Sequence, residues 1–122
     1  MKTILVSLIS FFVADKLVGQ NNDTNELIRI TKEGLTEKTE VTYDNSEMIL
    51  QIGDYLFPCS TNSSVKLKQE KGAYQVEFFL QKNTAIRSNR DASYRRAWYA
   101  LPFKSRKLAN DFIAAFRTAC SQ

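Results

Sequence analysis

The chain has 122 residues, 17 Lys and Arg against 13 Asp and Glu, a formal net charge of +4 and 43% apolar residues. This length and composition fit one small globular domain and exclude a polytopic membrane protein and wholesale disorder. The sequence contains no histidine, which excludes Ser-His and Cys-His catalytic pairs and every His-bearing zinc site.

The first segment in chain order is basic and then apolar. Met1 and Lys2 precede an apolar run, residues 4–14, whose only polar members are two serines. This length is typical of a secretory signal peptide, whereas a membrane-spanning helix needs about 20 apolar residues. We therefore expect a signal peptide at residues 1–19 and a secreted or periplasmic protein with no stable membrane anchor. The alternative is a buried first strand or helix of the domain.

Two cysteines, Cys59 and Cys120, are the only ones in the chain. In an oxidising compartment they predict a disulfide, which in the chain-entropy model stabilises a fold by roughly 4 kcal/mol. The alternative is two separate buried thiols, since free cysteine packs as a small apolar side chain. Their spacing fits no metal motif, and we expect neither a metal nor a cofactor.

The next segments combine a polar start with strand patterns. Residues 20–26 are polar and are expected to form a flexible lead-in to a single β-rich domain at residues 27–122. A short apolar group at residues 27–30, ended by Gly34, fits either a strand or a short helix. Alternation then predicts strands at residues 41–43, 48–52 and 55–57. Gly53-Asp54 between the last two is typical of a two-residue hairpin turn, because glycine accepts the positive φ of a type II′ turn.

The second half of the chain continues with strands and then changes period. We expect strands at residues 65–68 and 74–80, joined by a turn at 70–72, then a polar and basic connection at 84–93. A further strand at residues 95–101 is expected to end at Pro102. Apolar residues at helical spacing predict an amphipathic helix over residues 104–119, with Ser105 as its N-cap.

The end of the chain resembles a known superfamily. The segment Ala-Leu-Pro-Phe-Lys-Ser at residues 100–105, followed by Leu108, Ala109, Phe112 and Phe116, is similar to the last strand and closing helix of pleckstrin-homology-like domains. Short strands followed by one helix predict the α+β class, mainly β. The resemblance implies about six to seven antiparallel strands in a bent sheet or partly open barrel, capped by one C-terminal helix. The export signal and the cysteine pair depart from the intracellular phosphoinositide role that is usual in that superfamily.

The charge is distributed unevenly along the chain. Residues 20–62 carry a net charge of −5, and residues 63–122 carry +8. The arginine segment, residues 87–96, holds four arginines and a tyrosine, and a tryptophan follows it: Arg87, Arg90, Tyr94, Arg95, Arg96 and Trp98. Guanidinium groups bind phosphate, sulfate and carboxylate, and aromatic rings add stacking surfaces. We expect these six residues to bind an anionic ligand or a protein partner. The alternative is that the arginines only cover apolar surface and keep the sheet soluble.

No catalytic motif stands out. The sequence has no nucleophile elbow or phosphate-binding loop, and its carboxylates form no pattern that would pair two of them across a cleft. We therefore expect an exported, non-catalytic binding or interaction module. The alternatives are a secreted, disulfide-stabilised inhibitor or effector and a small hydrolase with paired carboxylates in a cleft. A net charge of only +3 after removal of residues 1–19 argues against dedicated nucleic-acid binding.

Overall fold

A computed structural model describes residues 22–59, 64–81 and 83–120 of the chain, and the expected signal peptide, residues 1–19, lies outside them. The described residues form an N-terminal helix (residues 22–34), eight strands and a C-terminal helix, α2 (Arg106–Cys120). The strands are β1 (Val41–Asp44), β2 (Ile49–Ile52), β3 (Tyr55–Pro58), β4 (Ser64–Glu70), β5 (Ala73–Phe79), β6 (Ile86–Ser88), β7 (Arg95–Arg96) and β8 (Trp98–Phe103). The predicted α+β class, mainly β, is confirmed.

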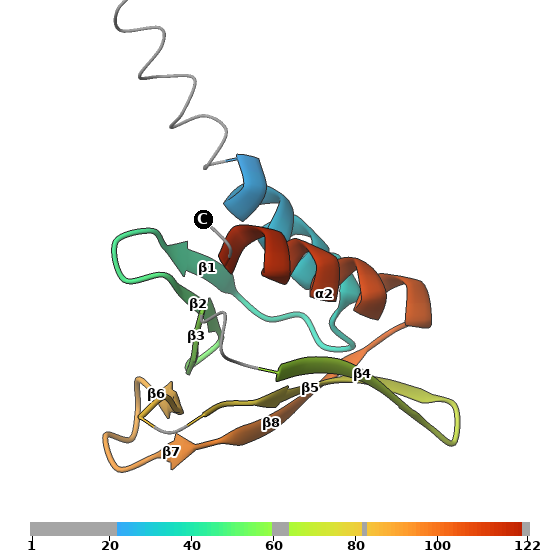
Figure 1. The fold of residues 1–122 in the computed structure, drawn as a ribbon. Coiled ribbons are helices and arrows are strands. Elements are labelled where there is room, and N and C mark those ends of the chain that lie inside the picture. Colours follow the sequence, from blue (N-terminus) through green and yellow to red (C-terminus); the bar gives the residue numbers. More distant parts are fainter. Residues whose placement is uncertain (1–21, 60–63, 82, 121–122) are drawn as a thin grey trace, which may run out of the picture.

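The strands form two antiparallel sheets. One sheet has the order β1-β2-β3-β6-β7, the other has the order β4-β5-β8, and neither closes into a barrel over the described ranges. Helix α2 packs on one face of β4-β5-β8, with the N-terminal helix beside it (Figure 1). The opposite face of this three-stranded sheet is not covered by either helix (Figure 1).

The predicted turns are confirmed. Ile52 pairs with Tyr55 across a two-residue turn in which Gly53 has a φ of 60°. Between β4 and β5, Lys71 and Gly72 have φ values of 48° and 80°, as a type I′ turn requires. Both hairpins therefore have the register that their turn residues favour.

The short apolar group at residues 27–30 lies in a helix. Its buried side includes Leu27, Ile30 and Thr31, and the Thr31 hydroxyl donates a hydrogen bond to the Leu27 carbonyl at 2.6 Å. The helix begins at residue 22, so residues 22–26, expected in a flexible lead-in, form its first turns. Most side chains of residues 22–26 are exposed, although Thr24 is buried. A polar composition fits the exposed face of a helix as well as a loop, so composition alone does not separate the two.

The end of the N-terminal helix lies so close to Phe103 that only glycine fits at position 34. A Cβ atom on Gly34 would lie 2.5 Å and 2.6 Å from two ring carbons of Phe103. The Phe103 ring is 2% exposed and packs on Phe112 at 5.2 Å between centroids, so it has little room to move.

We expect Gly34→Ala to lower the free energy of unfolding by about 1–3 kcal/mol, because overpacking forces side chains from their rotamers. Urea unfolding measures the loss. In a Phe103→Leu background, Gly34→Ala should lower the free energy of unfolding by clearly less, since the clashing ring edge is gone. An equal loss in both backgrounds would show that the close approach to Phe103 is not the cause.

The prediction that the last strand ends at Pro102 was wrong. Strand β8 continues through Pro102 to Phe103, with Pro102 opposite Gln75 of β5. Proline is tolerated because β8 is an edge strand, with β5 as its only neighbour among the described strands. The missing N–H of Pro102 therefore removes no hydrogen bond from the β5–β8 ladder. On the other side, the Pro102 carbonyl accepts a hydrogen bond from the Thr36 amide at 3.2 Å. The segment after the N-terminal helix thereby lies beside the end of β8.

Helix α2 closes the core as its spacing predicted. The Ser105 hydroxyl accepts a hydrogen bond from the Leu108 amide at 3.1 Å, which confirms the N-cap. The buried residues of α2 are Ala109, Phe112, Ile113, Phe116, Ala119 and Cys120. Phe112 and Phe116 make edge-on contacts with Phe78 of β5, which joins the helix to the sheet.

The predicted disulfide is confirmed. It joins Cys59, just after β3, to Cys120 at the end of α2, and the two Cα atoms are 5.1 Å apart. This bond ties the first sheet to the helix that covers the second, and it is compatible with a secreted or periplasmic location. No helix in the described part of the chain is both long and apolar enough to cross a membrane.

Candidate functional site

The arginine segment forms the edge of the first sheet. Strand β6 pairs with β3, and β7 pairs with β6 as the outermost strand. Residues 84–93 were expected to form a polar connection, and strand β6 was not predicted. Ile86 is the fully buried residue of β6, but one large apolar side chain in a short strand gives no alternating pattern.

Two of the four arginines lie directly opposite each other. Arg87 of β6 and Arg95 of β7 are register partners, so their side chains project from the same face of the sheet. Both are exposed, and neither makes an ion pair with the residues that the structure describes. This arrangement leaves two adjacent guanidinium groups facing solvent.

The other two arginines have partners within the fold. The Arg90 Nε atom lies 3.2 Å from a carboxylate oxygen of Asp54, in the β2–β3 turn. The Arg96 guanidinium lies over the Tyr94 ring, 4.9 Å from its centroid. The arginine segment is therefore not one cluster, because only Arg87 and Arg95 have guanidinium groups without such a partner in the described ranges.

The loop between β6 and β7 is held by its own side chains. Asp91 accepts hydrogen bonds from the Ser93 hydroxyl at 2.6 Å and from the Ser93 amide at 3.0 Å. These bonds, with a smaller effect from Arg96, lower the pKa of Asp91, so the carboxylate stays charged at neutral pH. The turn fixes the path of the chain from Arg87 to Arg95.

Trp98 belongs to the second sheet. It is opposite Phe79 in the β5–β8 register, and its indole N–H donates a hydrogen bond to Glu77 at 3.1 Å. Its side chain is 49% exposed and that of Phe79 is 44% exposed. No cation–π contact joins Trp98 to an arginine among the described residues. Trp98 thus contributes to the uncovered face of β4-β5-β8, apart from the sheet that holds Arg87 and Arg95.

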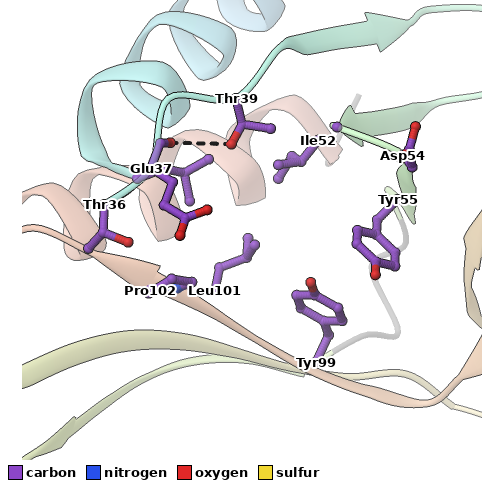
Figure 2. A pocket seen from close by; sticks show the side chains of 11 residues that line it. Thr36, Glu37, Thr39, Ile52, Asp54, Tyr55, Tyr99, Leu101 and Pro102 are labelled. Carbon is purple, nitrogen blue, oxygen red and sulfur yellow. Dashed lines mark hydrogen bonds between the residues drawn. The ribbon is translucent and has the colours of Figure 1, made fainter.

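A cavity of about 390 Å³ lies where the two sheets approach each other (Figure 2). Three segments form its walls: the chain after the N-terminal helix, the β2–β3 turn and strand β8. The lining residues are Leu35, Thr36, Glu37, Thr39, Ile52, Gly53, Asp54, Tyr55, Tyr99, Leu101 and Pro102. Pockets of this size and mixed character are typical of small-molecule sites.

Two tyrosines form one side of the cavity. The Tyr55 and Tyr99 rings are 5.3 Å apart, inclined at 50°, and Figure 2 shows both hydroxyl groups directed toward the same space. Burial, with smaller effects from Tyr55 and Tyr94, raises the pKa of Tyr99, so its hydroxyl stays protonated. Tyr94 packs on Tyr55 at 5.4 Å. A chain of rings therefore connects the arginine segment to the cavity.

The sequence pattern does not indicate this cavity, and Glu37, Tyr55 and Tyr99 are not among the six residues expected to bind a ligand. Nothing in the local pattern shows that the chain after Gly34 returns along β8, because the pairing of Leu35 with Phe103 spans distant parts of the sequence.

No family model, no curated protein and no solved structure matches the chain. The residues that the structure describes contain no group of three or more Cys, Asp or Glu side chains that would hold a metal ion.

Proposed function

We propose that the chain is an exported, disulfide-stabilised, non-catalytic binding module that recognises an anionic group through Arg87 and Arg95. The observation that carries this proposal is the direct cross-strand pairing of the two arginines on an exposed face. Like charges placed opposite each other destabilise a sheet. A phosphate, sulfate or carboxylate bound between them replaces that repulsion with charge-assisted hydrogen bonds.

The surroundings of the pair support the same function. Strand β7 is the edge of its sheet, so a ligand reaches the two side chains without displacing another element. The Asp91–Ser93 turn and the Arg90–Asp54 ion pair order the loop that carries them. Less conformational entropy is then lost when an anion binds.

The test compares two variants with the same change in charge. We expect Arg87→Gln/Arg95→Gln to elute from a heparin column at clearly lower salt than the native protein. In heparin-oligosaccharide titrations, the slope of log affinity against log salt should fall by about 2, one for each arginine replaced. The matched control is Lys104→Gln/Arg106→Gln, which removes two exposed charges near the start of α2. Equal weakening in the two variants would contradict a specific site and leave only an effect of net charge.

A second candidate is a secreted inhibitor or effector that binds one protein partner. It is favoured by the adjacent, exposed Phe79 and Trp98 side chains, because aromatic residues of this kind form the centres of protein interfaces. A stoichiometric partner whose capture resists salt, survives Arg87→Gln/Arg95→Gln and is abolished by Trp98→Ala would favour this candidate over anion binding.

A further inference from the structure

We propose that the cavity between the sheets is a second binding site, which takes a small organic cation: an ammonium group carried on an apolar body. This site is separate from the Arg87–Arg95 pair and selects a ligand of opposite charge. Three features of the cavity carry the inference: its charge, its two tyrosine rings and its volume.

The first feature is the charge of the lining. Two of the eleven lining residues, Glu37 and Asp54, are acidic and none is a lysine or arginine, although basic residues outnumber acidic ones in the chain as a whole. Arg90 pairs with Asp54, whereas Glu37 makes no ion pair with any residue that the structure describes. Figure 2 shows Glu37 and Asp54 on opposite sides of the cavity. The lining therefore attracts a cation and repels an anion.

The second feature is the pair of tyrosine rings. Rings inclined at 50° with their centroids 5.3 Å apart form a corner, and an ammonium group within about 6 Å of a ring centroid is attracted by its π-electrons. The two hydroxyls, which have no hydrogen-bond partner among the described residues, add partial negative charge on their oxygens. Tyr55 also packs on Tyr94, with 5.4 Å between ring centroids, so the corner exists before a ligand binds.

The third feature is the size and apolar floor. A volume of about 390 Å³ is at the small end of ligand pockets, which range from about 300 to 1,000 Å³. Leu35, Ile52 and Leu101 supply buried apolar side chains to the lining. A ligand with alkyl or aromatic carbon next to its charge fits both the floor and the tyrosine corner.

The loop that carries Glu37 is ordered by local bonds. The Thr39 hydroxyl donates to the Glu37 carbonyl at 3.2 Å, and the Thr36 amide donates to the Pro102 carbonyl at 3.2 Å (Figure 2 draws the first). These bonds connect the loop to β8 and set the position of the backbone that carries Glu37. The backbone at Glu37 and the aromatic corner are thus placed beside the cavity before a ligand binds.

The experiment is an NMR titration of the native protein with choline and with 3,3-dimethyl-1-butanol, its neutral isostere. We expect saturable shifts at the Gly53 and Leu101 amides with choline, and affinity about tenfold lower for the isostere, because only the cation gains from the rings and the carboxylate. Equal affinities would overturn the proposal and leave an apolar cavity. So would shifts centred on the Trp98 indole, or no saturable shift with choline, tetramethylammonium or benzyltrimethylammonium.

Two variants test the assignment to Glu37. Both residues concerned are exposed, so folding should be preserved. Glu37→Gln should weaken choline binding several-fold, and Glu47→Gln, which removes the same charge outside the cavity lining, should leave it unchanged. Equal weakening in both variants would overturn the role of Glu37. Arg87→Gln/Arg95→Gln should not weaken choline binding, which separates this site from the anion site.

Discussion

Replacing Phe78 with alanine will lower the free energy of unfolding by about 3–5 kcal/mol, whereas the same change at its neighbour Phe79 will alter it by less than about 1 kcal/mol. The two residues are adjacent on β5 and face opposite sides of the sheet. Phe78 is 1% exposed and packs against the rings of Phe57, Phe112 and Phe116, with centroids between 5.0 Å and 6.0 Å away. Its removal leaves a cavity where the sheet meets α2.

Urea unfolding of the two alanine variants measures the difference. The midpoint should fall strongly for Phe78→Ala, with the slope unchanged, since the surface exposed on unfolding stays nearly the same. Phe79→Ala is the matched control because it removes the same atoms from the same strand. Similar decreases at both positions would mean that the face carrying Phe79 is covered in the folded protein.

Removing the disulfide by Cys59→Ala/Cys120→Ala will lower stability by about 4 kcal/mol, because the bond closes a loop of 61 residues. For a domain of this size, the thermal midpoint should fall by roughly 15–25 °C. Alanine is preferred to serine because Cys120 is buried, and a buried hydroxyl without a partner would add its own penalty.

The reduced native protein is the control for this prediction. Its unfolding midpoint should coincide with that of the alanine variant, since both lack the cross-link. A midpoint that reduction leaves unchanged would contradict the role of the bond. The intact mass of protein recovered outside the cytosol tests export as well, because the proposal requires the loss of residues 1–19 and of the two thiol hydrogens.

Local signals were sufficient for much of the fold. The turns at Gly53-Asp54 and Lys71-Gly72 and the N-cap at Ser105 each depend on a few neighbouring residues, and all three are where the sequence indicated. The strand that contains Phe78 alternates between apolar and polar residues from Tyr74 to Phe78, which predicts a strand with one buried face. The likeness to pleckstrin-homology-like domains stays a prediction, because no comparison tests it.

The errors arise where distant segments decide the outcome. Proline usually ends a strand, and Pro102 is accommodated within β8 because β8 is an edge strand of its sheet. Strand β6 exists because Ile86 fills a buried position and β3 offers a free edge. The candidate sites have the same origin. Arg87 and Arg95 pair through β6 and β7, and Glu37 and Tyr99 line one cavity because the chain after Gly34 runs beside β8.

The order of the strands also determines how the molecule comes apart. After β3 the chain leaves the first sheet to build β4 and β5, returns to add β6 and β7, and then leaves again for β8. Neither sheet is made from one continuous stretch of sequence. No cut yields two halves that each retain a complete sheet, so the whole domain must assemble and melt as a single cooperative unit.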